Sequence, residues 1–90
     1  MVELTSRIIN EIINADGEAE IIKAIDKSID DLLSKENYSG KSKRNFLINA
    51  IMALRYSKSE QLATESRLPN IDKGIEIFER IRKNEYRSFF

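Results

Sequence analysis

The chain has 90 residues, of which 41% are hydrophobic and 33% are charged. This composition is typical of a globular protein rather than a disordered one, and the length limits the chain to one small domain. Fifteen basic and fifteen acidic side chains give a formal net charge of zero, and the sequence contains neither Cys nor His. The lack of both residue types excludes disulfides, thiol nucleophiles and imidazole bases, and with them most zinc and haem sites.

Two further features bear on the location of the protein in the cell. No stretch of about 18 to 20 residues is apolar without interruption, as a membrane-spanning helix requires. The first residues also lack a basic region followed by an apolar run, so the sequence shows no secretory signal. We therefore expect a cytoplasmic protein.

Two amphipathic segments occupy the first 35 residues. In residues 2–14 the apolar positions fall on one face of a helix, and they are Leu4, Ile8, Ile9, Ile12 and Ile13. Asp16 follows, next to Gly17, and is placed to cap a second helix that extends to about Lys35. The apolar stripe of this second helix is predicted to consist of Ile22, Ile25, Ile29 and Leu32.

A third amphipathic segment follows Gly40, with Ser42 as the expected cap. Its apolar positions are Phe46, Leu47, Ala50, Ile51 and Leu54. The pattern could extend through Leu62 and Ala63, but Ser57 weakens the stripe. The sequence leaves open whether this is one long helix or a helix with a turn near Ser57.

A firmer break comes at Leu68 and Pro69, because Pro disfavours helical geometry in the preceding residue yet fits the first turn of a new helix. A fourth helix is then marked by Ile71, Ile75, Phe78 and Ile81, with Gly74 permitting a neighbouring helix to approach closely. The stripe loses its regularity after Lys83, so residues 84–90 are expected to form a short C-terminal tail.

Four amphipathic segments joined by short connections favour an all-α, antiparallel up-and-down four-helix bundle that forms a single domain over residues 1–90. The buried core is predicted to include apolar residues from all four helices. These residues are Ile9, Ile12, Ile22, Ile25, Ile29, Leu32, Leu47, Ile51, Leu54, Ile75, Phe78 and Ile81.

Charge is distributed unevenly along the chain. Residues 16–31 contain six acidic and two basic side chains, whereas residues 41–59 contain five basic side chains and no acidic one. One interpretation is that the second and third helices lie side by side and complement each other. The alternative is that the basic helix faces a membrane or an acidic partner.

Few residues are candidates for catalysis or metal binding. Asp26 and Asp30 could project paired carboxylates from one helix face, but the polar side of an amphipathic helix would carry them in any case. The three glycines are isolated, so there is no glycine-rich phosphate loop, and no serine elbow or HExxH motif occurs. We expect a protein that is not an enzyme and that needs no cofactor or metal.

Nucleic-acid binding would require a basic face, usually with an excess of positive charge over the domain. Lys41, Lys43 and Arg44 could contact phosphates, but the net charge is zero, so no nucleic acid is expected as a partner. A regulatory or nucleic-acid-binding module that uses these three residues remains the alternative function, together with a homo-oligomeric helical adaptor.

Four aromatic residues are not explained by the helical stripes, namely Tyr56, Tyr86, Phe89 and Phe90. The two terminal phenylalanines could fold back over the end of the bundle. Alternatively, a mobile tail could insert into a partner or into the interface of a membrane, a role that suits tyrosine and arginine because each combines apolar contact area with a polar or charged tip. The residues of that tail would be Lys83, Tyr86, Arg87, Phe89 and Phe90.

The order of these segments resembles a known family. The second helix ends in Lys35-Glu36-Asn37-Tyr38, the third contains the run FLINAIMALRY from Phe46 to Tyr56, and Arg67-Leu68-Pro69 precedes a fourth helix and a short tail. This layout, over nearly the whole chain, resembles the enterocin-A-type immunity proteins that lactic acid bacteria and streptococci make against class II bacteriocins.

The resemblance implies a cytoplasmic four-helix bundle that protects its producer from a pore-forming peptide. It implies action at the cytoplasmic side of the bacteriocin-bound sugar-transport permease, with a peripheral contact to the inner face of the membrane. In that family the C-terminal half and tail set which bacteriocin is countered. Carried onto this chain, the partner-binding residues would be Leu68, Pro69, Lys83, Tyr86, Arg87, Phe89 and Phe90.

Overall fold

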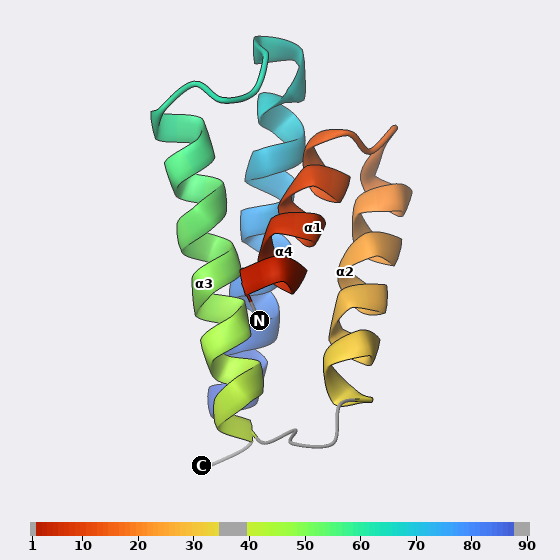
Figure 1. Cartoon of the computed structure of the whole chain (residues 1–90), viewed down its shortest axis with the longest axis vertical. Coiled ribbons are helices and arrows are strands. Elements are labelled where there is room, and N and C mark those ends of the chain that lie inside the picture. The colour runs from red at the N-terminus through yellow and green to blue at the C-terminus, as the bar shows by residue number, and fades with distance from the viewer. Residues whose placement is uncertain (1, 35–39, 88–90) are drawn as a thin grey trace.

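The computed structural model describes the backbone of residues 2–34 and 40–87 and the side chains of residues 4–34 and 43–84. The described chain forms an all-α antiparallel up-and-down four-helix bundle, in which successive helices run in opposite directions (Figure 1). The elements are α1 (Val2–Ile13), α2 (Glu18–Leu33), α3 (Gly40–Ser59), the short 3₁₀ helix η1 (Glu65–Arg67) and α4 (Leu68–Arg87). The fold class expected from the apolar periodicity is therefore confirmed. None of the described helices combines the length and the apolar character needed to span a membrane.

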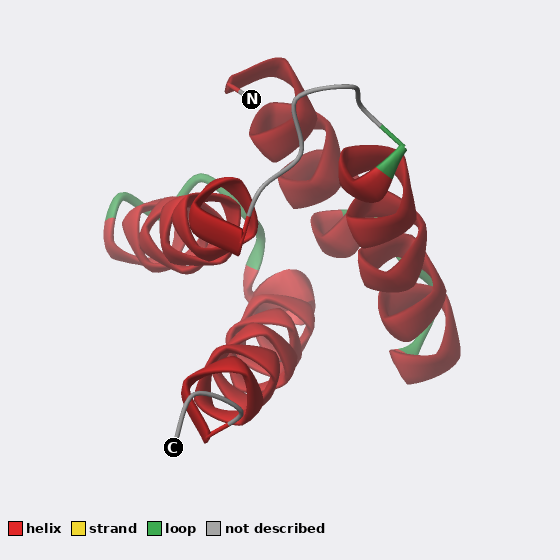
Figure 2. Cartoon of the chain, turned by 90° about the horizontal axis from the view of Figure 1, so that it is seen from below, coloured by secondary structure: helices red, strands yellow, loops and turns green. Residues whose placement is uncertain are grey.

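Around the bundle the helices follow the order α1, α2, α4, α3 (Figure 2). α2 packs against α1 and α4, whereas α3 packs against α4 and α1. The acidic α2 and the basic α3 thus lie diagonally opposite each other, and the interpretation that they lie side by side is wrong. Their charges meet partners on the other two helices instead. The ion pairs include Arg7 with Asp31 at 2.8 Å, Arg55 with Glu79 at 3.3 Å, and Lys58 with Asp72 at 2.7 Å.

Gly74 lies where α4 meets both α1 and α3. A Cβ atom at Gly74 would lie 3.1 Å from Ile12 Cγ2 and 3.1 Å from Leu54 Cδ1, both on fully buried side chains. Because there is no side chain at this position, α4 approaches α1 and α3 at van der Waals distance. The diagonal between α1 and α4 is therefore short, and α2 and α3 are held apart on either side of it.

The core is formed by residues from all four helices and is centred on Phe46 and Phe78, whose rings meet edge to face at a centroid distance of 6.1 Å. Most of the expected core is confirmed as buried, namely Ile9, Ile12, Ile25, Leu32, Leu47, Ile51, Leu54 and Phe78. Three further residues, Ile29, Ile75 and Ile81, are partly buried against it. Leu4, Ile8, Ala15, Ile21, Phe46, Ala50 and Ile71 complete the core.

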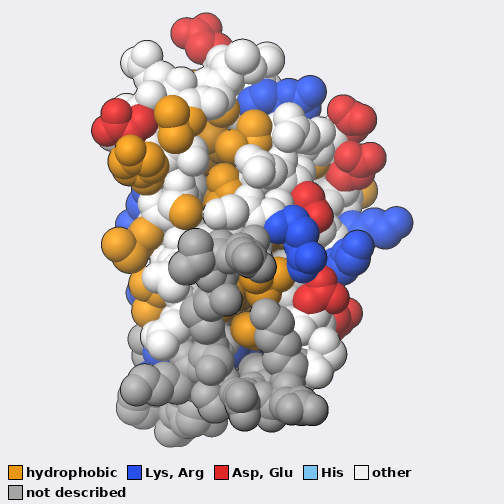
Figure 3. Space-filling view, viewed as in Figure 1, with side chains coloured by type: hydrophobic (Ala, Val, Ile, Leu, Met, Phe, Trp, Pro, Cys, Tyr) orange, Lys and Arg blue, Asp and Glu red, His pale blue; other side chains and the backbone are white. Residues whose placement is uncertain are grey.

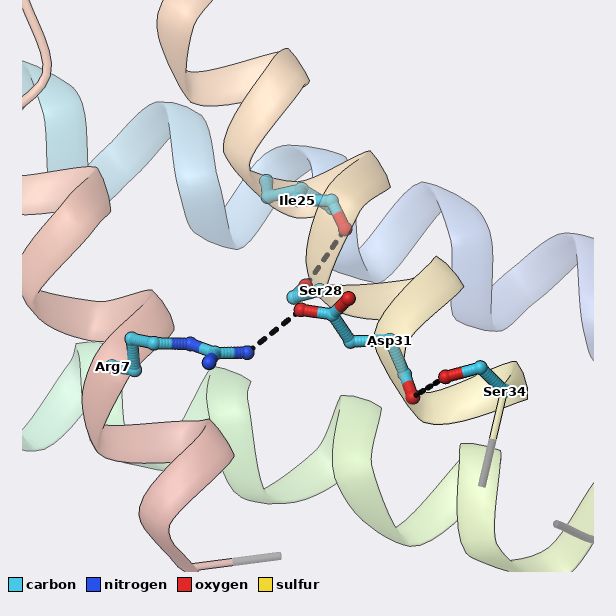
Figure 4. Close-up of polar contacts among 5 residues, drawn as sticks. All are labelled: Arg7, Ile25, Ser28, Asp31 and Ser34. Atoms are coloured by element: carbon cyan, nitrogen blue, oxygen red, sulfur yellow. Dashed lines mark hydrogen bonds and ion pairs between the residues drawn. The ribbon is translucent and has the colours of Figure 1, made fainter. Parts of the chain in front are cut away.

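The expected stripe of α2 is confirmed at Ile25 and Leu32 and is wrong at Ile22. Ile22 is 41% exposed, and the buried stripe consists of Ile21, Ile25, Ser28 and Leu32. Ser28 can occupy a core position because its Oγ donates a 2.7 Å hydrogen bond to the carbonyl oxygen of Ile25, one turn earlier (Figure 4). This bond satisfies the hydroxyl within its own helix, so burial leaves no polar group without a partner.

Several helix ends also differ from expectation. Asp16 does not cap α2: the cap position is taken by Gly17 at a φ of 137°, and the backbone N–H of Asp16 donates to Glu20 Oε2 at 2.7 Å. Ser42 lies inside α3, because that helix already begins at Gly40. At its other end α3 continues through the buried Ser57 and stops at Ser59.

The last helix, α4, extends further toward the C-terminus than the sequence indicated. α4 begins at Leu68, with Pro69 in its first turn as expected, and it continues to Arg87. Residues 84–87 are therefore helical and do not belong to a tail, because the backbone hydrogen bonds of the helix do not require the apolar stripe to continue. Residues 88–90 lie outside the described residues.

Candidate functional site

The expected partner-binding residues fall into two groups at opposite ends of α4. Leu68 is half-buried and Pro69 is exposed at the start of the helix, whereas Lys83 is exposed near its end. The backbone of Tyr86 and Arg87 belongs to α4, but their side chains, and Phe89 and Phe90 altogether, lie outside the described residues. A helix of this length rises about 28 Å from one end to the other, so the two groups do not form one site.

The connection between α3 and α4 is closed by a tight turn centred on Gln61. Gln61 has a φ of 56°, in the left-handed region, and is the only non-glycine residue of the described chain with a positive φ. Its N–H donates to Lys58 O at 3.2 Å, and the N–H of Leu62 donates to Ser57 O at 2.9 Å. These two bonds form a Schellman motif, in which glycine usually takes the position held here by Gln61.

The residue that follows this turn points outward. In most Schellman motifs the next residue packs an apolar side chain back onto its helix. Here Leu62 would make that contact, but it is 63% exposed; of the two helix positions it could meet, Ser57 is polar and Tyr56 is itself 61% exposed. An apolar side chain is therefore held on the surface by a backbone whose hydrogen bonds are satisfied.

A pocket of about 380 Å³ lies beside the turn and is lined by Lys58, Gln61, Ala63, Glu65 and Leu68. The charge of Lys58 is matched, because its Nζ contacts Asp72 Oδ1 at 2.7 Å. Glu65 is exposed and makes no ion pair within the described part of the chain. The pocket thus combines an apolar wall with one carboxylate that lacks a counterion.

A set of hydrogen bonds, which we call the latch, fixes this connection to the end of α1. Arg67 Nη1 donates to Ala15 O at 2.8 Å, and Asn70 Nδ2 donates to Ala15 O at 2.9 Å and to Ile13 O at 3.2 Å. Carbonyls at the end of a helix have no partner within that helix, so Asn70 supplies one for Ile13, the last residue of α1, and both side chains bind the carbonyl of Ala15 in the connection that follows. The latch places both the α1–α2 and the α3–α4 connections at the same end of the bundle (Figure 1).

An ion pair ties the same end of α4 to α2. Lys73 Nζ lies 3.1 Å from Glu18 Oε1 and 3.5 Å from Glu76 Oε1. The hydrogen bond to the Glu18 carboxylate raises the pKa of Lys73 above its ordinary value of 10.5. Together with the latch, this ion pair joins α2, α4 and the end of α1 around the start of α4.

Apolar side chains are also exposed along α3. Met52 is 63% exposed and Tyr56 is 61% exposed, one helical turn apart on the outer face of that helix. Figure 3 shows hydrophobic side chains along the edge of the molecule that α3 and the following loop occupy. Tyr56, one of the aromatics that the stripes left unexplained, is accounted for as part of this outer face.

The remaining candidate residues do not assemble into a site. Asp31 pairs with Arg7, as Figure 4 shows, while Asp26 and Asp30 are exposed on α2. Within residues 4–34 and 43–84, no group of three or more acidic side chains is arranged to hold a metal ion. Lys43 and Arg44 are engaged in contacts of their own, and the side chain of Lys41 lies outside the described residues.

Sequence reasoning placed the start of α4 correctly but missed four residues of this end of the bundle, namely Gln61, Leu62, Arg67 and Asn70. Of these four, only Leu62 could have been singled out from the sequence, because it is an apolar residue that follows a run of polar ones after the stripe of α3 has ended. Comparisons of the chain with protein-family models, curated proteins and solved structures found no match.

Proposed function

We propose that this chain is a non-enzymatic bacteriocin immunity protein. In this proposal it protects a cell from a pore-forming class II bacteriocin by binding at the cytoplasmic side of the bacteriocin-bound permease. The observation that supports this proposal most directly is that a fixed turn in the α3–α4 connection holds Leu62 on the surface beside a pocket. The family that the sequence resembles has its recognition determinants in the same half of the chain.

An exposed leucine at a rigid turn suits binding better than stability. Full burial of a leucine side chain contributes about 1.5–3 kcal/mol, and 63% of the Leu62 surface is still available to a partner. Burial of that remainder corresponds to roughly a 5- to 30-fold gain in affinity. The backbone loses little additional entropy on binding, because the Schellman bonds and the latch already fix it.

The test is protection of a bacteriocin-sensitive strain that expresses the chain, challenged with a panel of class II bacteriocins. We expect protection against at least one of them, reduced by Leu62→Ser and retained by the matched variant Leu33→Ser. Leu33 is 44% exposed on α2 and stands at the opposite end of the bundle from the turn. Equal protection by both variants would remove the α3–α4 connection from the proposal.

Failure to protect against any bacteriocin of a broad panel would contradict the proposed function itself. Salt-dependent binding of duplex DNA would then favour a nucleic-acid-binding module, since neutralised phosphates release counterions. A stable homo-oligomer would instead favour a helical adaptor.

A further inference from the structure

The pocket beside the Gln61 turn has the size and the lining of a small peptide-binding site. Its volume of about 380 Å³ falls at the lower end of the range of about 300–1,000 Å³ typical of ligand pockets. Ala63 and Leu68 are both half-buried and supply its apolar wall. One or two side chains of a partner would fill this volume. Leu62, which precedes Ala63 in the chain and is exposed, could contact the same partner.

The charges around the pocket indicate the sign of its occupant. Lys58 is neutralised by Asp72 at 2.7 Å, which leaves Glu65 as the charge in the lining that can still be paired. Glu60 adds a second exposed carboxylate beside Gln61, and it too has no ion pair among the residues described. A basic group entering here would gain a counterion, whereas an acidic group would meet repulsion at close range.

The pocket is also formed before any partner arrives. The latch holds η1 and the start of α4 on the end of α1, and the Schellman bonds hold Gln61 and Leu62. Binding therefore requires little ordering of the chain, and a small contact area can give measurable affinity.

From these observations we infer that the pocket receives a basic segment of a partner protein. An aliphatic side chain of that segment contacts Ala63 and Leu68, and an adjacent lysine or arginine pairs with Glu65. The inference rests on the proposed function, because it takes the α3–α4 connection to be the recognition surface. It adds the chemical class of the partner. It also predicts that an anionic membrane does not bind here.

The experiment uses the full ¹⁵N-labelled chain at low ionic strength. It is titrated with a synthetic peptide of lysine and leucine, and with the same peptide in which glutamate replaces every lysine. We expect the lysine peptide to shift the backbone resonances of residues 58–68 and to bind about three- to tenfold more tightly than its acidic counterpart. Glu65→Lys should reverse this preference, and Glu65→Gln should reduce it to what the carboxylate of Glu60 supports.

Asp26→Lys is the matched control, because it makes the same charge change at an exposed position on the polar face of α2. It should leave the preference for the lysine peptide in place. If Asp26→Lys reduces the preference as much as Glu65→Lys does, binding follows net charge and the inference is overturned. Shifts confined to Met52 and Tyr56, or displacement of the peptide from residues 58–68 by vesicles of anionic lipid, would overturn it as well.

The protection assay separates this inference from the proposed function. Loss of protection by Glu65→Lys, with protection retained by Asp26→Lys, supports both. Equal protection by the two variants overturns the pocket as the recognition site while the function stands. Charge-dependent peptide binding at the pocket, in a chain that protects against no bacteriocin, overturns the function and supports the pocket.

Discussion

Replacement of Gln61 by glycine should make the protein more stable, although it removes a side chain from the surface of the bundle. Gln61 has a φ of 56°, and an L-residue in this region is disfavoured by about 1–2 kcal/mol. Glycine has no Cβ and avoids that strain, but it loses roughly 0.5–1 kcal/mol more conformational entropy on folding. The two Schellman hydrogen bonds use only backbone atoms, so the substitution preserves them. We expect a net stabilisation of about 0.5–1 kcal/mol.

Urea unfolding followed by circular dichroism measures this change directly. With a slope of about 1 kcal/mol per molar urea for a domain of this size, the midpoint should rise by about 0.5–1 M. Glu60→Gly is the matched control, because Glu60 precedes Gln61 and does not have a positive φ. Glycine at position 60 should lower stability by about 0.5–1 kcal/mol. If both variants move the midpoint in the same direction, the left-handed turn is not the source of the effect.

Four further substitutions and one truncation test the packing, the latch and the C-terminal residues. Ile25→Ala should destabilise the bundle by about 2–5 kcal/mol, whereas Ile22→Ala should change stability by less than about 1 kcal/mol, and equal effects in urea melts would refute the observed register of α2. Gly74→Ala should lower stability by about 1 kcal/mol, since crowding of two buried side chains outweighs the better helix propensity of alanine, and a more stable variant would contradict the close approach of α4. Asn70→Ala should lower the urea midpoint by an amount equivalent to about 1–2 kcal/mol, and an unchanged midpoint would show that the latch adds no stability. Deletion of residues 87–90, the last residue of α4 and the three that follow it in the sequence, should abolish protection while lowering stability by less than about 1 kcal/mol, and a large drop in melting temperature would indicate that these four residues stabilise the bundle.

The apolar periodicity was sufficient to predict the fold class and most of the core. Ile25 and Leu54 are fully buried, as their spacing indicated. The periodicity did not predict the register of α2. The most hydrophobic stripe of this helix uses Ile22 and Ile29, whereas the buried stripe uses Ile21 and Ser28 at the corresponding turns. A serine can replace an aliphatic residue in a helix core when its hydroxyl bonds to a carbonyl of the same helix, and residue type alone does not reveal this.

The candidate site was harder to predict than the core. Pro69 indicated where α4 begins, because the constraint of its ring acts locally. The left-handed φ of Gln61 had no such signal, since glutamine is not a residue type that favours this region. The latch joins Asn70 to Ala15, 55 residues apart in sequence, so it depends on how the helices pack.

Gly74 connects the packing of the bundle to the geometry of the pocket. Asn70 and Gly74 are one turn apart on α4, and therefore lie on the same face of that helix. Gly74 faces Ile12 near the end of α1, and Asn70 meets the carbonyl oxygens of Ile13 and Ala15 that follow. A side chain at position 74 would move α4 away from α1, and the 2.9 Å bond from Asn70 to Ala15 O would lengthen with it. A helix contact outside the pocket lining is thereby linked to the latch, and through it to the start of α4, where Leu68 lines the pocket.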